Sequence, residues 1–203
     1  MAAIDCARAI LKYISDIDTA VTLVAIAGAE SSWREDAAGD RFGGYWSCDG
    51  YQSWGPWQIN IDAHHSWLVT LVGSSNPCDI ARWLSNYDNN ALAAATILAR
   101  QGLCAWTVYE EWCGGWPHNG RYRSYLDQAR EAVNTAIASG GGTGGTEIHI
   151  PGETAGISPL HILLPLGVLV LGASGTGLLV LWHKGASISD MKDALLRRIR
   201  HGR

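Results

Sequence analysis

The sequence predicts a mainly α-helical domain over residues 1–138, followed by a linker, a single transmembrane helix and a short tail. In the first 138 positions, apolar residues recur mostly at helical spacing, with little of the alternation that marks strands. A glycine-rich stretch follows at 139–156, and residues 157–182 then contain no Asp, Glu, Lys or Arg. A chain of 203 residues with 47% hydrophobic content is long enough for one packed domain and a remainder.

The expected helices follow the apolar periodicity and the residues that start and stop helices. Asp18 is expected to cap the second helix. Three glycines are expected to end helices: Gly73, Gly102 and Gly114. Residues 34–53 are predicted as a loop, with a short hairpin around GGYWSCDGYQSW as one option. The helices themselves are expected at residues 3–15, 19–31, 61–72, 89–101, 105–112 and 121–138.

The C-terminal third is expected to attach this domain to a lipid membrane. Residues 139–156 have the composition of a flexible linker. Residues 157–183 are interpreted as a transmembrane helix, because a spanning helix needs roughly 20 apolar residues. A buried hairpin or an oligomer core is the alternative interpretation of the same stretch. Residues 184–203 are predicted to form a basic amphipathic tail.

Charge is distributed unevenly along the chain. Residues 1–138 hold 9 Lys and Arg against 15 Asp and Glu, whereas residues 183–203 hold 6 against 2. The positive-inside tendency therefore places the tail on a cytoplasmic side and the helical domain on the other side. The tail suits anionic lipid headgroups or nucleic acid, and the sequence does not choose between them, so no specific nucleic-acid partner is predicted.

The five cysteines leave their chemistry open. They are Cys6, Cys48, Cys78, Cys104 and Cys113. One or two disulfides and buried free thiols are both compatible with an odd number of cysteines without a CxxC pair. Their spacing to the histidines matches no strong zinc pattern, so no metal site and no cofactor are expected.

Glu30 is the candidate catalytic acid. On a helix it shares a face with the apolar residues Leu23, Ile26 and Ala27. A carboxyl group held among apolar groups has a raised pKa, so it stays protonated near neutral pH and can donate its proton to a leaving oxygen. The alternative is that Glu30 only ends the helix in solvent or caps a neighbouring backbone group.

The order of several short motifs resembles the lysozyme-like superfamily that contains the soluble lytic transglycosylases and goose-type lysozymes. In that family a helix ends in Glu-Ser, and a Gly-x-x-Gln-Ile turn follows. An alanine-rich helix opened by Asn and a cleft-closing aromatic segment come next. The matching residues here are Glu30 with Ser31, Gly55 with Gln58 and Ile59, Asn90 with Ala91, Ala94 and Gly102, and Trp106 with Tyr109. The resemblance covers residues 19–129.

Two motifs depart from the family pattern. The more typical Gly-Leu-Met-Gln is replaced by Gly-Pro-Trp-Gln at residues 55–58, and the Tyr-Asn-Ala-Gly signature is replaced by VYEEWCGG. Tyr109 is the best match for the aromatic residue near the acid, with Tyr122 and Tyr125 as rivals. Residues 41–53 also form a longer insertion than a minimal member needs, which is expected to build a distinct wall of the cleft.

The resemblance implies cleavage of the β-1,4 bond between N-acetylmuramic acid and N-acetylglucosamine in bacterial peptidoglycan. Glu30 would be the catalytic acid, with Ser31 orienting it. Trp54 and Trp57 are expected to stack on apolar sugar faces, because they lie beside the central motifs. The other expected substrate-binding residues are Gln58, Asn60 and Tyr109. Gln58 and Asn60 are equally expected to hold their turn together.

The kind of cleavage depends on whether a second carboxylate is present. The family resemblance implies a lytic transglycosylase, in which the substrate's own 6-hydroxyl replaces water and leaves a 1,6-anhydromuramic end. A hydrolytic lysozyme would instead need a second Asp or Glu near the acid. Asp40 and Asp49 are the leading candidates for that second carboxylate. A non-catalytic wall-binding membrane protein is the alternative from another functional class.

The N-terminus lacks the basic and apolar regions of a secretory signal. A wall-cutting domain without such a signal, tethered to one membrane span, fits a bacteriophage particle that opens the cell wall at infection, in contact with other virion proteins. A bacterial wall-remodelling enzyme is the runner-up.

Overall fold

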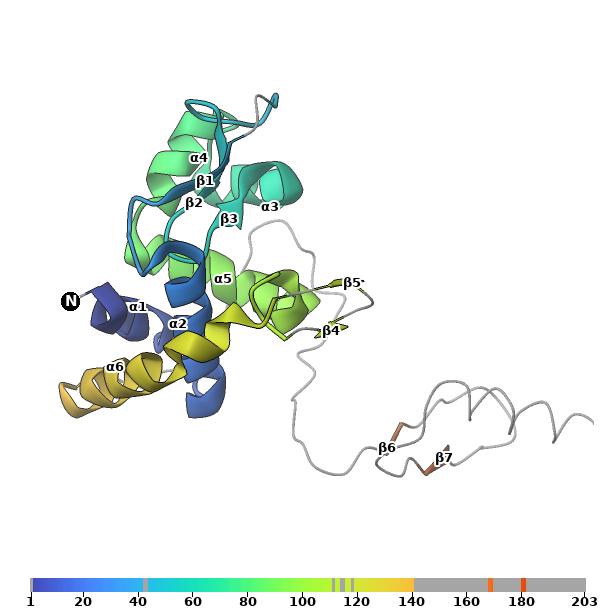
Figure 1. Ribbon diagram of the computed structural model, residues 1–203. Coiled ribbons are helices and arrows are strands. Elements are labelled where there is room, and N and C mark those ends of the chain that lie inside the picture. Colours follow the sequence, from blue (N-terminus) through green and yellow to red (C-terminus); the bar gives the residue numbers. More distant parts are fainter. Residues whose placement is uncertain are drawn as a thin grey trace, which may run out of the picture. The chain divides into compact units, whose positions relative to one another are not determined.

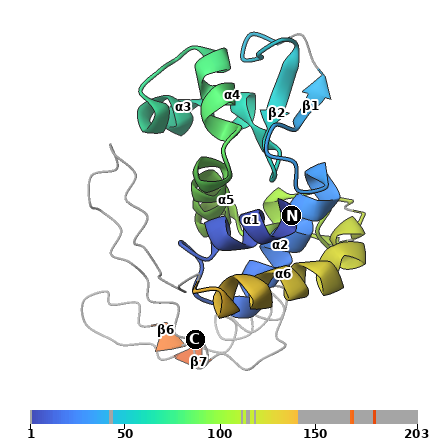
Figure 2. The same ribbon diagram turned by 90° about the vertical axis from the view of Figure 1, so that its left-hand side faces the viewer.

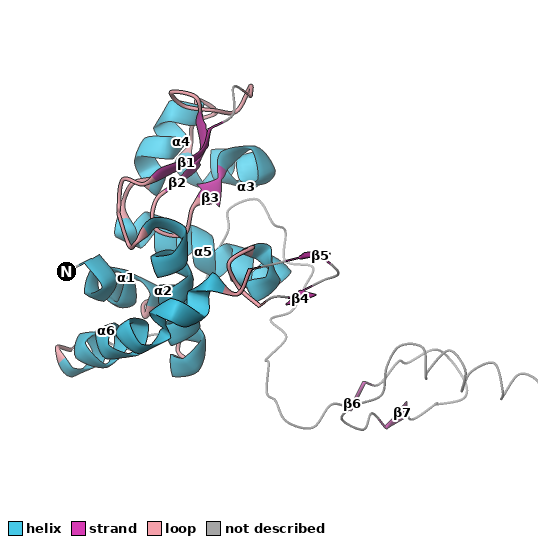
Figure 3. Ribbon diagram, in the orientation of Figure 1, coloured by secondary structure: helices cyan, strands magenta, loops and turns pink. Residues whose placement is uncertain are grey.

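A computed structural model describes residues 2–41, 44–110, 112–113, 116–117, 119–140, 168–169 and 180–181. The chain divides into two compact units, Met1–Glu153 and Thr154–Arg203. The first unit is built mostly from helices (Figure 3), which confirms the prediction of a mainly α fold.

Three helices pack together in the lower layer of the first unit (Figure 1). They are α1 (Ala2–Ile10), α2 (Ile17–Ser31) and α6 (Leu126–Ala138). Ten of the 15 residues of α2 are buried, because its sequence is apolar on nearly every face and α1, α6 and the short helix η2 (Arg121–Tyr125) pack against it. The helix that ends in Glu30 is therefore the centre of the core.

A small antiparallel sheet and two helices form the upper layer, and α5 lies between the two layers in both views (Figures 1 and 2). The sheet has the order β1-β2-β3, with Gly39 opposite Ser53 and Ser53 opposite Asn60. Its first two strands form a hairpin, but the first of them lies before the segment GGYWSCDGYQSW, around which a short hairpin was considered. The elements are β1 (Ala38–Arg41), β2 (Tyr51–Trp54), β3 (Ile59–Asn60), α3 (Ile61–Val72), α4 (Pro77–Leu84) and α5 (Tyr87–Gln101).

Helix ends follow capping chemistry, with one correction to the sequence prediction. Asp16, not Asp18, caps α2, because its Oδ1 accepts a hydrogen bond of 2.8 Å from the Thr19 backbone N–H. Gly73 and Gly102 lie at the ends of α3 and α5, where each donates its backbone N–H to the helix, as predicted. Gly114 lies outside the described residues.

Two other helix predictions are wrong. The described residues between 106 and 112 contain no helix: the 3-10 helix η1 (Leu103–Ala105) is followed by irregular chain at 106–110, and strand β4 (Trp112–Cys113) pairs with β5 (Trp116–Pro117). Helix α4 was missed, although Asn76 caps it and Pro77 occupies its first turn, a common helix-start signal. The first helix also ends at Ile10, before the predicted Ser15.

Two disulfides lie in the first unit. Cys48 bonds to Cys78 and Cys104 bonds to Cys113, while Cys6 is a buried free thiol. The first disulfide joins the β1–β2 hairpin to the start of α4. The second joins η1 to β4.

The Asn90 carboxamide joins α5 to the turn between β2 and β3. Its Oδ1 accepts from the Trp57 backbone N–H at 3.0 Å. Its Nδ2 donates to the carbonyl oxygens of Trp54 at 3.0 Å and Leu84 at 2.9 Å. Asn90 is fully buried, and Gly55 has a positive φ of 77° at a place where a Cβ would clash with this amide. The fold therefore needs both Asn90 and Gly55.

In the second unit, Val168–Leu169 (β6) pairs antiparallel with Val180–Leu181 (β7). Among the described residues, no helix has the length and hydrophobicity needed to cross a membrane. The expected span at 157–183 lies outside the described residues apart from these four, as do the tail at 184–203 and all of the linker except 139–140.

Replacing Asn90 should destabilise the fold strongly. Asn90→Ala leaves one buried N–H and two buried carbonyl groups without a partner, so the free energy of unfolding should fall by about 2–4 kcal/mol. Asn134→Ala, on the exposed face of α6, should change it by less than about 0.5 kcal/mol. Urea denaturation measures both values, and a loss below about 1 kcal/mol for Asn90→Ala would contradict the role assigned to this side chain.

Candidate active site

A cavity of about 380 Å³ lies in the first unit, between the end of α2 and the sheet layer. Its walls come from five parts of the chain: the last turn of α2, the three strands, the first turn of α3, the end of α5 and the segment after η1. The described residues that line it are Glu30, Asp40, Ser53, Gln58, Ile59, Asn60, Ala63, His64, Ile97, Gln101, Ala105, Trp106 and Thr107.

Glu30 reaches the cavity because α2 stops one residue after it. Ser32 adopts a left-handed conformation with φ 56°, and its N–H closes the helix onto the carbonyl groups of Ala27 and Gly28. Burial, and after it the Asp40 carboxylate, raises the pKa of Glu30 to about 7. A carboxyl with this pKa is protonated in about half of the molecules at neutral pH, which suits a general acid.

Arg121 opposes this shift without cancelling it. Its guanidinium lowers the pKa of Glu30 and donates a 2.9 Å hydrogen bond to the Ala29 carbonyl oxygen. Since the pKa of Glu30 is nevertheless well above its ordinary value, the loss of hydration outweighs this attraction.

Asp40 faces the same cavity from β1, at its exposed rim. It has a positive φ of 53°, and its Oδ2 accepts a short hydrogen bond from the Ser53 hydroxyl. The Asn60 amide in turn lies 3.4 Å from the Ser53 Oγ. Adjacent strands therefore align Asp40, Ser53 and Asn60 as one polar row along the wall.

Gln58 and Asn60 both line the cavity and also hold local structure together. The Gln58 Nε2 donates to the carbonyl oxygens of Gly55 at 2.9 Å and Ala37 at 3.1 Å. The Asn60 Oδ1 caps α3 by accepting from the Ala63 N–H at 3.0 Å. Both residues therefore hold local structure and also face the cavity, while their contact with a sugar stays a prediction.

The two tryptophans expected to stack on sugars do not meet the cavity. Trp57 is fully buried, and its indole N–H donates to the Leu23 carbonyl oxygen at 2.8 Å, so the expectation of direct sugar contact is wrong for this residue. Trp54 is half-buried and is not among the lining residues. Both side chains pack in or against the core, because the turn between β2 and β3 is fixed by Asn90.

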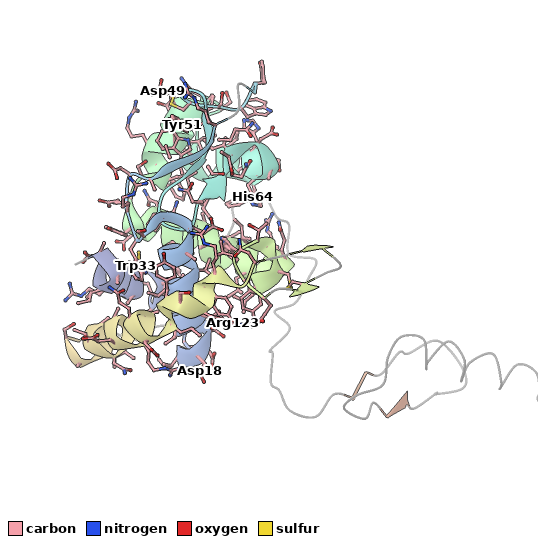
Figure 4. The ribbon with its side chains drawn as sticks, in the orientation of Figure 1. Asp18, Trp33, Asp49, Tyr51, His64 and Arg123 are labelled. Atoms are coloured by element: carbon pink, nitrogen blue, oxygen red, sulfur yellow. A yellow bond between two sulfur atoms is a disulfide. The ribbon has the colours of Figure 1, made fainter. Side chains whose placement is uncertain are left out.

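Ser31, Tyr109 and Asp49 also lie outside the described cavity lining. The buried Ser31 hydroxyl donates back to the Ala27 carbonyl oxygen within α2. The Tyr109 ring packs against Tyr122, with centroids 4.9 Å apart. Asp49 is exposed beyond the hairpin strands, far from the end of α2 in Figure 4. Of the two candidate second carboxylates, only Asp40 therefore shares the cavity with Glu30.

Nine lining residues were missing from the predicted site: Ser53, Ile59, Ala63, His64, Ile97, Gln101, Ala105, Trp106 and Thr107. Burial, followed by the nearby charge of Arg100, lowers the pKa of His64 and so favours its neutral imidazole. Trp106 donates its indole N–H to the Trp57 carbonyl oxygen at 3.0 Å, which places the segment after η1 against the cavity. His64 follows Asn60 by one helical turn, and this spacing in the sequence could have identified it as a residue of the same site.

Few residues in the described part of the chain are grouped closely enough to bind a metal ion. The one group of possible ligands found there is Cys48, Asp49 and Cys78. Both sulfur atoms of this group are bonded to each other, so they are not available as thiolate ligands.

Comparison with protein family models, curated proteins and solved structures found no match to this chain.

The pKa of Glu30 should respond in opposite directions to its two charged neighbours. Asp40→Asn removes a charge that raises this pKa, so the pKa should fall below 7. Arg121→Gln removes a charge that lowers it, so the pKa should rise above 7. Carbon-13 NMR titration of the Glu30 side-chain carboxyl measures both shifts, with Asp127→Asn on the exposed face of α6 as the control. An equal Glu30 pKa in the unaltered chain, in both cavity variants and in the control would contradict the assigned effects of Asp40 and Arg121.

Proposed function

We propose that this chain cleaves the β-1,4 bond between N-acetylmuramic acid and N-acetylglucosamine in peptidoglycan, with Glu30 as the general acid. The observation that carries the proposal is that Glu30, with a pKa of about 7, shares one cavity with the Asp40 carboxylate. Glycoside hydrolysis usually uses two carboxyl groups, of which one is protonated and acts as the acid while the other is ionised.

The lining of the cavity suits a sugar substrate. Amide and hydroxyl groups of Gln58, Asn60 and Thr107 can pair with acetamido and hydroxyl groups of the glycan. The Trp106 ring supplies an apolar wall. The motifs that carry the family resemblance support the same substrate, because Gln58 lines the cavity and Asn90 fixes the turn that presents it.

In the hydrolytic route, Glu30 protonates the leaving glycosidic oxygen as the C1–O4 bond breaks. Asp40 then takes a proton from the water that attacks C1. Two side chains, Ser53 and Asn60, hold the Asp40 carboxylate in place. The Ser53 hydroxyl donates to the carboxylate, and the Asn60 amide lies against the Ser53 Oγ. The position of Asp40 favours this route.

In the transglycosylase route, the 6-hydroxyl of the muramic acid attacks C1 in place of water. Glu30 first gives its proton to the leaving oxygen and then accepts the proton of the 6-hydroxyl. The family resemblance favours this route, which needs no second carboxylate.

The proposed biological setting rests on the C-terminal sequence. A phage particle that carries this domain on a lipid membrane, through residues 157–183, would open the wall locally at infection. A cellular wall-remodelling enzyme is the alternative setting for the same reaction.

The purified full chain should solubilise a peptidoglycan suspension, and Glu30→Gln should slow this at least about 100-fold, because a positioned acid contributes that much. The amide is nearly the same size and cannot donate an acidic proton. Turbidity and release of soluble muropeptides measure the rate. Glu131→Gln, on the exposed face of α6, is the matched control and should keep full activity.

Two outcomes would contradict the proposal. Equal rates for the chain and Glu30→Gln would remove Glu30 from the chemistry. Binding to peptidoglycan without any release by either protein would favour the non-catalytic wall-binding alternative.

A further inference from the structure

The segment 44–50, between β1 and β2, presents an aromatic pair on the surface of the first unit. The Tyr45 side chain is 86% exposed. It meets Trp46 edge to face, with ring centroids 4.6 Å apart. The Trp46 ring lies flat on the His65 imidazole of α3, with centroids 3.4 Å apart and an angle of 28°. Three rings in contact thus lead from α3 to the solvent, the inner two stacked and the outer two edge to face.

Covalent and hydrogen bonds hold this segment in place. The disulfide from Cys48 anchors it to Cys78 at the start of α4. Cys48 and Tyr51 exchange two backbone hydrogen bonds, of 3.0 and 2.9 Å. The Ser47 hydroxyl donates to the Gly44 carbonyl oxygen at 2.7 Å. The aromatic pair is therefore presented in one arrangement, which reduces the entropy cost of binding.

The ring group lies on α3, the helix whose first turn lines the cavity described above. His64 lines that cavity, and His65 is the next residue of α3. Successive helical residues point about 100° apart, so the two imidazoles lie on neighbouring faces of the same turn of α3. A linear polymer that occupies the cavity can therefore continue over Trp46 and Tyr45.

The rings also have chemistry that suits a sugar. Exposed aromatic faces stack on the apolar faces of pyranose rings, while their edges remain free for polar contacts. The His65 Nε2 is buried and has no hydrogen-bond partner among the described residues. Buried polar atoms without a partner are rare, so this nitrogen marks the His65 side of the ring group as incompletely satisfied.

We propose that Tyr45, Trp46 and His65 form a distal carbohydrate-binding platform, which holds the glycan strand beyond the bond that is cleaved. This inference rests on the proposed function. It defines the substrate class more narrowly, as a long glycan strand in place of a short oligosaccharide.

The test separates binding from cleavage by using the Glu30→Gln background. Sedimentation of the full chain with purified peptidoglycan gives an apparent Kd for Glu30→Gln alone and combined with Tyr45→Ala. The loss of one stacked sugar contact should raise this Kd about three- to tenfold. Tyr45 is nearly fully exposed, so its replacement does not endanger folding. The matched control is Ile137→Ala, the other large exposed hydrophobic residue in the described part of the chain, which should leave the Kd unchanged.

A second readout compares substrates of different length. In the active chain, Tyr45→Ala should lower the ratio of the cleavage rate on long glycan strands to the rate on tetrasaccharides by the same factor. Ile137→Ala should leave this ratio unchanged.

Three results would overturn the platform. One is an unchanged Kd for the Tyr45→Ala combination. Another is Tyr45-dependent binding to phosphatidylglycerol and phosphatidylethanolamine vesicles without binding to peptidoglycan. The third is self-association of the chain that Tyr45→Ala abolishes. Absence of cleavage by the unaltered chain would instead count against the proposed function alone, because the sedimentation assay does not depend on cleavage.

Discussion

The hydrogen bonds of the Asn90 carboxamide set the geometry on which the candidate site depends. One buried side chain ties the turn between β2 and β3 to α5 and to the end of α4. That turn places the Trp57 indole in the core, where it bonds to the Leu23 carbonyl of α2. Trp106 then bonds to the Trp57 carbonyl. These bonds hold three elements around one cavity: helix α2 with Glu30, strand β1 with Asp40, and the segment after η1 with Trp106.

The raised pKa of Glu30 lowers the stability of this fold at neutral pH. Its pKa is about 7 in the folded chain and about 4.5 in an exposed carboxyl. The folded state therefore holds more protons between these values, and stability is lost as the pH rises from 4.5 to 7. The loss amounts to at most about 3 kcal/mol. A hydrophobic or amide side chain would avoid this loss, and the proposed role of Glu30 as a general acid accounts for a carboxyl group at this position.

Local signals in the sequence predicted part of this arrangement and tertiary packing determined the rest. Helix α3 was predicted at its observed bounds, 61–72, because its cap and its terminal glycine are adjacent to the apolar pattern. Gly55 and Asn90 were identified as separate motif residues, whereas their contact and the hydrogen bonds of Asn90 were not predicted. Trp57 and Asp49 were misjudged, since burial and the position of a loop tip depend on contacts distant in sequence. The pairing of the cysteines was undetermined for the same reason.

The central claim is that the cavity cleaves a glycan and that Glu30 and Asp40 act in it together. Mass spectrometry of the muropeptides released from purified peptidoglycan tests this most directly. Hydrolysis with Asp40 as the partner predicts free reducing ends, heavier by one water than 1,6-anhydro ends, and their loss in Asp40→Asn. Anhydro ends formed equally well by Asp40→Asn would contradict the role of Asp40, and intact glycan strands would contradict the claim as a whole.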